Sequence, residues 1–271
     1  MVVNADDFGL TEGVSRGILA AHAAGALRST SMFATAPGFA PAAALAARTP
    51  TLAVGLHFNL TIGAPVAPLE RVPSLWSRRT GRFYPLRALA GRALLGRVAH
   101  EHVAVECRAQ LERLVAAGIR VTHIDSHRHV HALPGIWRGV VAAAREGGAR
   151  YVRIPVEPPL GRRALTKAGI AAMWRWASRG TGRPLPAHPE HFRGIGLLGS
   201  PRVRDDLLDL LERLPAGRSE LMVHPGYADA ELAAWDAYGA PRERELAALC
   251  APDVLARLTR GDIVLTHFGE L

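Results

Sequence analysis

The sequence predicts an α/β fold with a parallel sheet, arranged as a single domain, and three observations lead to this prediction. The chain has 271 residues, which is about the length of many one-domain α/β barrels. Short apolar runs alternate with segments of helical period, as expected for parallel strands joined by helices. Nearly every apolar run also ends in His or Asp. The alternation fits a closed barrel as well as a sheet covered by helices on both faces.

Six short apolar runs are the expected strands. The first precedes Asp6 and Asp7, and Thr11 should cap the helix after it, because a threonine oxygen accepts from amides in a helix's first turn. Another helix, at residues 203–214, should open at Ser200 and Pro201, since proline fits a first turn. The six strands are expected at residues 1–4, 52–57, 120–125, 151–154, 220–224 and 262–267.

Two segments interrupt the alternation and are expected to be loop insertions within the single domain, at about residues 62–102 and 155–200. Both carry tryptophan among many arginines, including Trp76, Trp174 and Trp176. Long loops in a compact domain are usually functional or disordered. Aromatic residues interleaved with arginine suit stacking on sugar rings over a substrate groove, and they equally suit an interface in a homo-oligomer.

Composition excludes several classes of protein. A hydrophobic fraction of 49% with 21% charged residues is that of a globular chain, not a disordered one. Cys107 and Cys250 have no paired spacing, so neither a disulfide framework nor a cysteine zinc site is expected. No transmembrane segment or leader is visible, and we expect a cytoplasmic protein. The net charge of +9 comes from arginines spread along the chain, which argues against a nucleic-acid partner.

Ionisable side chains are most concentrated at residues 122–131, which contain four imidazoles and the Asp125 carboxylate. If this run is extended, the odd-numbered positions from His123 to His131 share one face, because side chains alternate along a strand. Neutral imidazoles beside a carboxylate are typical ligands of a divalent metal, most often zinc. A solvated histidine-rich loop is the alternative.

Other polar residues end the remaining strands. Asp6, Asp7, His57, His224 and His267 all fall at or just past the expected carboxyl ends. In a parallel barrel these ends meet on one face, where active sites are built. The sequence therefore predicts that scattered residues form one cluster there.

The aspartate pair suggests divided roles. Asp6 and Asp7 cannot both face one point from extended backbone, so either the chain turns or one carboxylate binds a metal while the other takes a proton from bound water. A turn with a helix cap is the alternative. An open catalytic site keeps three protein ligands, which Asp7, His57 and one histidine after Asp125 would supply.

Two further residues have open interpretations. Hydrolysis of an amide needs an acid for the leaving group, and His224 is the candidate because the Pro-Gly after it forces a turn. A buried structural histidine would look the same. Arg153 ends another strand and could bind a carboxylate through its fork, or could lie on the surface.

Five motifs in order along the chain give a resemblance to a known family. They are NADDFG at residues 4–9, GLHFNLT at 55–61, THIDSHRHVH at 122–131, HPGY at 224–227 and THFGE at 266–270. Together they resemble the YdjC-like carbohydrate deacetylases, a group that includes chitooligosaccharide deacetylases and the deacetylases of hopanoid biosynthesis. The motifs span essentially the whole chain.

This resemblance implies a distorted (β/α) barrel like the polysaccharide deacetylase (NodB-like) fold. It implies a metal-dependent hydrolase that removes the N-acetyl group from an amino sugar or glycoconjugate by attack of a metal-bound water, with one zinc or magnesium ion. By position, Asp6 resembles the general base, and His224 is a plausible acid. The implied metal ligands are Asp7, His57 and His127, and the residues implied to support them or to face the substrate are Asp125, His129, His131, Arg153 and His267.

Two other functions fit the same residues. A metal-dependent phosphoesterase is one, because His/Asp barrels also perform that chemistry and basic loops suit a phosphate. A non-catalytic protein that binds nucleic acid or acidic glycans is the other, and it predicts strongly salt-dependent binding that survives removal of the metal.

Overall fold

The computed structural model describes residues 1–179, 181 and 184–271, and in these residues seven parallel strands form one curled sheet. Strand β1 (Val2–Phe8) lies between β2 (Ser29–Met32) and β9 (Ser219–Val223). The sheet order is β7-β6-β3-β2-β1-β9-β8, with β3 (Ala53–Phe58), β6 (Val121–Ser126), β7 (Tyr151–Val152) and β8 (His191–Arg193).

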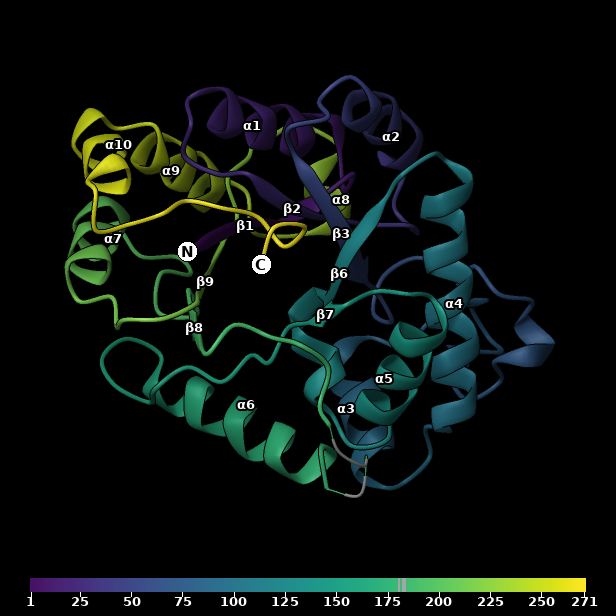
Figure 1. The fold of residues 1–271 in the computed structure, drawn as a ribbon. Coiled ribbons are helices and arrows are strands. Elements are labelled where there is room, and N and C mark those ends of the chain that lie inside the picture. The colour runs from purple at the N-terminus through teal and green to yellow at the C-terminus, as the bar shows by residue number, and fades with distance from the viewer. Residues whose placement is uncertain (180, 182–183) are drawn as a thin grey trace.

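Contacts across the interior show how far the sheet curls. Arg153, just after edge strand β7, donates at 2.6 Å to Glu220 on β9, next to the opposite edge. Helices surround the sheet, as Figure 1 shows, with α1, α2, α9 and α10 over one side and α4 and α5 over another. The prediction of a single-domain α/β fold with a distorted barrel is confirmed.

The local signals predict the start of α1 correctly, whereas α7 begins at Val203, so Pro201 lies outside its first turn and that expectation is wrong. Helix α1 (Glu12–Ala23) is capped by Thr11, whose side chain accepts from the Val14 amide. Helix α7 (Val203–Glu212) follows Ser200, which accepts from the Arg202 amide. The other helices are α2 (Phe39–Ala47), α3 (Leu86–Leu94), α4 (His100–Ala116), α5 (Ile136–Glu146), α6 (Ala164–Ala177), α8 (Leu232–Trp235), α9 (Ala240–Leu249) and α10 (Pro252–Thr259).

The two segments expected to be insertions have different structures. Residues 62–102 leave the sheet and contain the short helix η1 (Leu69–Arg71), the hairpin β4 (Trp76–Ser77) and β5 (Arg82–Phe83), and α3. Residues 155–200 contain α6 but also β8, which pairs with β9 and is part of the main sheet. The second segment therefore contributes both a peripheral helix and an edge strand.

Five of the six expected strands are present, with ends shifted by one to a few residues. The sixth prediction is wrong: residues 262–267 form no strand, and only Thr266 makes a single bridge, to Val2. Strands β2 and β8 were not predicted. Their sequences, Ser-Thr-Ser-Met and His-Phe-Arg, lack the apolar run that marks a buried strand.

Candidate active site

A cavity of about 180 Å³ lies at the carboxyl ends of β1, β3, β6 and β9. This is the edge of a parallel barrel where strand ends and loops converge. The predicted residues that line it are Asp6, Asp7, His57, His127, His129 and His224.

Both consecutive aspartates of β1 line this cavity, and the backbone explains how. Asp7 has a φ of 75°, in the left-handed region that non-glycine residues rarely adopt. The pairing of β1 with β2 shifts register over the same stretch, between Ala5 and Phe8. The left-handed residue breaks the alternation that would otherwise send Asp6 and Asp7 to opposite faces. Such local strain is typical of functional positions.

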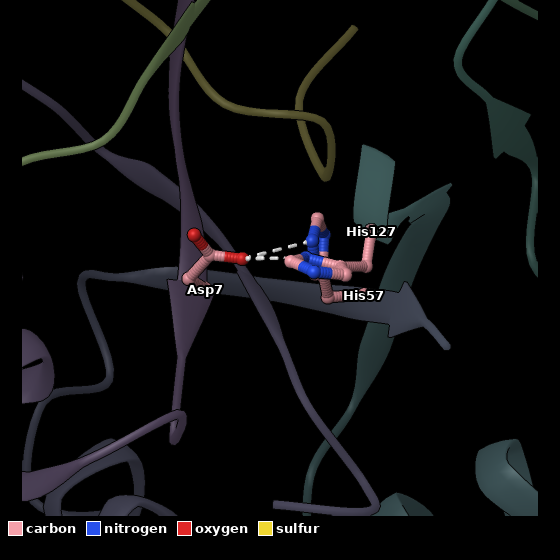
Figure 2. A group of neighbouring side chains, drawn as sticks. All are labelled: Asp7, His57 and His127. Carbon is pink, nitrogen blue, oxygen red and sulfur yellow. Dashed lines mark ion pairs between the residues drawn. The ribbon is translucent and has the colours of Figure 1, made fainter. Parts of the chain in front are cut away.

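Three strand ends bring one carboxylate and two imidazoles together, as Figure 2 shows. Asp7 Oδ1 lies 3.0 Å from His57 Nε2 and 3.4 Å from His127 Nδ1. One nitrogen or oxygen from each side chain falls within 4.8 Å of the others, and all three residues are buried. Two imidazoles and a carboxylate are a donor set that suits zinc and similar divalent ions.

The hydrogen bonds around these residues leave donor atoms available. His57 Nδ1 donates to Asp125 Oδ1 at 2.7 Å, which fixes the ring and directs the Nε2 lone pair toward Asp7. Asp7 Oδ1, His57 Nε2 and His127 Nε2 are buried without a hydrogen-bond partner in the described residues. Buried polar atoms are rarely left unpaired, so these residues fit a cation.

The charge at His57 supports the same interpretation. Burial disfavours a charged ring, but Asp125 and Asp7 outweigh burial and raise the pKa of His57 to about 10. The two carboxylates therefore draw a positive charge to this position, which a proton or a metal ion can supply. A second group, made of Asp6, His57 and Asp125, is also compact, but hydrogen bonds and ion pairs already occupy its donor atoms.

Arg153 lies buried at the centre of the carboxylates. Its two terminal nitrogens donate to the two oxygens of Asp6 at 2.7 Å each. One of them also lies 2.9 Å from Asp125 Oδ2, and Nε binds Glu220. Burial alone would raise the pKa of Asp6, but the guanidinium holds it well below its usual range. Arg153 therefore binds carboxylates through its fork, and the surface alternative is wrong.

One guanidinium cannot neutralise three carboxylates. Burial and the charge of Asp125 raise the pKa of Glu220 to about 7, although Arg153 opposes the shift. Burial and Asp6 likewise raise the pKa of Asp125. The charge of Arg153 thus favours the ionised form of Asp6 more than that of its neighbours.

On the other side of the cavity, Arg242 from α9 donates to Asp7 Oδ2 at 2.6 Å and to Asp236 at 2.7 Å. The bond from Arg242 holds the Asp7 carboxylate through Oδ2, and Oδ1 remains directed toward His57 and His127. Sequence reasoning missed Arg242 and Asp236 because they lie in a helix and a loop, not at strand ends. It also missed Ser31, which donates to Asp125 at 2.8 Å from the unpredicted strand β2.

His224 directly follows β9 and lines the same cavity, with Nε2 4.0 Å from Asp6 Oδ2. Its ring packs edge-on against Tyr238 at 5.8 Å, and its backbone amide donates to Glu245 at 2.7 Å. His224 Nδ1 is buried without a hydrogen-bond partner among the described residues. The ring is positioned to exchange a proton near Asp6.

The histidine-rich run does not continue as a strand, so the predicted alternation up to His131 is wrong. β6 ends at Ser126, and residues 127–132 form the short helix η2 (His127–Ala132), with left-handed backbone at Arg128 and His129. His129 lines the cavity. His131 is buried instead between Ser126 and the Arg153 carbonyl, 3.0 Å from its Nε2, and holds that segment in place.

Two other histidines lie away from the cavity. The His123 ring fills the barrel interior, stacked on Phe268 at 4.0 Å, and a Cβ on Gly55 would meet that ring at 2.3 Å. His267 was expected near the substrate, and this expectation is wrong. The amide of its neighbour Thr266 donates to the Met1 carbonyl, at the amino end of β1. His267 therefore lies at the opposite end of the sheet.

The chain matches the family model described as YdjC-like protein over residues 1–260. It is 35% identical over 278 residues to a carbohydrate deacetylase of Brevibacillus brevis, covering 100% of this chain and 99% of that one. It is also 35% identical to a chitooligosaccharide deacetylase of Yersinia pestis, covering 93% and 91%. The crystal structure of a candidate cellobiose-phosphate cleavage protein of Enterococcus faecalis aligns with a TM-score of 0.79 at 27% identity, covering 99% and 97%.

Proposed function

We propose that this chain, which belongs to the YdjC-like protein family, is a carbohydrate deacetylase that hydrolyses the N-acetyl group of an amino sugar or glycoconjugate. The observation that carries the proposal is the convergence of Asp7, His57 and His127 beside the ionised Asp6. Relatives named carbohydrate deacetylase, at 35 and 36% identity over nearly the whole chain, support the substrate class.

We assign Asp7, His57 and His127 as the residues that hold one divalent cation, zinc or magnesium. When bound, such a cation supplies a water of lowered pKa and stabilises negative charge on a carbonyl oxygen. Asp125 orients His57 through the 2.7 Å hydrogen bond to Nδ1, and Arg242 orients Asp7 from the other side. Such partners hold ligands in the geometry that a metal requires.

The proton transfers are assigned to Asp6 and His224. Asp6 is ionised and held by Arg153, so it can accept the proton of a water that attacks the acetyl carbonyl. His224 lies 4.0 Å from the Asp6 carboxylate and can deliver a proton to the leaving amine. The amide C–N bond breaks as that nitrogen takes the proton, which releases acetate and the free amino sugar.

The cavity is small, and a larger one of about 730 Å³ lies next to it. Consecutive residues join them, because Asp236 lines the smaller cavity and Trp235 lines the larger. Tyr84 and Arg82, from residues 62–102, also line the larger cavity. We assign the small cavity to the acetylated sugar and the larger to the rest of the substrate, where an aromatic ring can stack on a sugar.

The experiment that tests this function is a paired assay of acetate and inorganic phosphate. The purified protein, loaded with zinc or magnesium, is incubated with N-acetylglucosamine, chitooligosaccharides and phosphorylated sugars. The proposal expects acetate release from at least one N-acetylated substrate without release of phosphate. Phosphate release without acetate would overturn it in favour of a phosphoesterase.

A further inference from the structure

Helix α6 presents an unusual outer face. Leu165 is 90% exposed and Trp176 is 46% exposed, and Leu160 just before the helix is 74% exposed. At 100° per residue, Leu165, Ala172 and Trp176 fall on one stripe of the helix, since they are spaced by seven and four positions. Large apolar side chains exposed along one face of a helix are typical of a surface that binds a partner.

The side chains on the opposite face of α6 pack against the rest of the fold. Lys167 is buried and pairs with Glu157 at 2.7 Å, and Trp174 packs edge-on against Trp137 at 6.0 Å. α6 lies along the lower edge of the molecule in Figure 1, with one side toward the rest of the fold. The exposed stripe is therefore the side that the fold leaves uncovered.

Arginines flank this stripe. Residues 158–179 contain the exposed Arg162, Arg163, Arg175 and Arg179 and no acidic residue. Arg163 donates to the Leu198 carbonyl, and Arg162 lies 4.0 Å from Asp206. Arg175 and Arg179 have no ion-pair partner within the described ranges. The outer face of α6 therefore combines exposed apolar side chains, a half-exposed tryptophan and excess positive charge.

The exposed apolar side chains and the arginines together indicate what kind of partner binds the outer face of α6. A second copy in a symmetric dimer would place the same arginines against one another, which is unfavourable. A bilayer surface with anionic headgroups offers both an apolar layer and opposite charge, and tryptophan and arginine are enriched at that boundary. None of the described helices meets the length and apolarity that a bilayer crossing requires. We propose that α6 attaches this protein peripherally to anionic lipid membranes, with Leu165 and Trp176 entering the headgroup boundary.

The attachment surface lies close to the candidate active site. Ile170, on the inner side of α6, packs on a cluster of Phe192, Ile195 and Met222. Met222 lines the catalytic cavity, and α6 also packs on η2, which carries His127. A membrane bound along the outer face of α6 would therefore be separated from the wall of that cavity by the helix and the side chains on its inner face.

The test is vesicle flotation of the full chain. Wild-type protein should float with vesicles of equimolar phosphatidylcholine and phosphatidylglycerol and stay behind with pure phosphatidylcholine. Leu165→Ser with Trp176→Ser, and separately Arg175→Gln with Arg179→Gln, should each lower partitioning at least about tenfold. Matched controls are Val264→Ser, an exposed apolar residue elsewhere, and Arg202→Gln with Arg213→Gln, two exposed arginines that flank α7. Both controls should bind as the wild type does.

Three results would overturn the proposal. One is wild-type protein that fails to float with either vesicle. Another is flotation that both α6 variants retain. The third is a wild-type dimer in sedimentation velocity that becomes monomeric in Leu165→Ser with Trp176→Ser, which would assign the face to a second copy. Circular dichroism of each variant establishes that it is folded, and acetate release tests the catalytic proposal independently.

Discussion

Arg153 holds Asp6 by both carboxylate oxygens, with two N–O distances of 2.7 Å, at a position where the arginine is fully buried and the aspartate is 2% exposed. This pair links the segment after edge strand β7 to β1, four strands away in the sheet order. It also keeps one carboxylate charged among several that burial would neutralise. The fold and the proposed chemistry therefore depend on the same contact.

Replacing Arg153 by lysine should change the pH dependence of catalysis. Lysine keeps the charge but cannot bind both oxygens, so the pKa of Asp6 should rise from its depressed value. Since Asp6 must be ionised to accept a proton, the acid limb of kcat/KM should move to higher pH, and stability should fall by roughly 3 kcal/mol. Arg257→Lys is the control, because that buried arginine pairs with Glu212 away from the site. Identical pH profiles of kcat/KM in wild type and Arg153→Lys, down to the lowest pH at which both stay folded, would count against Asp6 as the base.

Glu220 predicts a pH dependence of stability. Its pKa is about 7 in the folded chain against an ordinary 4.5, so the folded state binds more protons between these values. The free energy of unfolding should therefore fall as pH rises through this window, by an amount on the order of 3 kcal/mol. Glu220→Gln should flatten that slope while its amide oxygen still accepts from Arg153. Urea unfolding at several pH values measures this pH dependence of stability. Substitution of the exposed Glu231 by glutamine (Glu231→Gln) is the control. A slope unchanged in Glu220→Gln would contradict the assignment.

Asp125 should control metal affinity without binding the metal. Asp125→Asn removes the carboxylate that accepts from His57 Nδ1, and loss of such a partner typically weakens a metal site about 10- to 100-fold. Competition with a zinc-binding dye measures the change. Asp205→Asn, an exposed carboxylate on α7, should leave affinity unaltered. Equal affinity in wild type and Asp125→Asn would show that His57 needs no such orientation.

Trp235 should affect only substrates that extend beyond one sugar. Trp235→Ala removes the ring at the boundary of the larger cavity, so KM for a disaccharide should rise roughly 2- to 10-fold. KM for a single N-acetylated sugar should change little. Trp176→Ala, on the distant stripe of α6, should alter neither. If Trp235→Ala weakened both substrates equally, the ring would support the catalytic cavity and not a neighbouring subsite.

The sequence predicted the parts of the fold in which burial leaves a local signal. Apolar runs marked β1, β3, β6, β7 and β9, and the polar residue after each run marked its carboxyl end. Because parallel strands align these ends, the sequence alone predicts that His57, His127 and Asp7 lie close together. The prediction of a strand at residues 262–267 was wrong. An apolar run can also form a segment that packs against the barrel without joining its sheet.

What the sequence could not show depends on contacts between distant segments. Arg242 is one of two arginines in α9, and only the packing of that helix against α1 and α7 brings it to Asp7. Strand β2 is polar because Ser29 and Ser31 bond to Asn4 and Asp125 inside the barrel. Likewise, the left-handed turn at Arg128 and His129 separates His127 from His131, although both lie at odd positions of one run.

The most direct test of the account measures bound metal and acetate release on the same preparations of wild type, Asp6→Asn, His57→Ala and His127→Ala. Wild type should hold one divalent ion per chain, and Asp6→Asn should hold the same ion with turnover reduced roughly a thousandfold. His57→Ala and His127→Ala should lose the ion and the activity together. Wild-type protein that is stripped of metal and still releases acetate at its full rate would contradict the account.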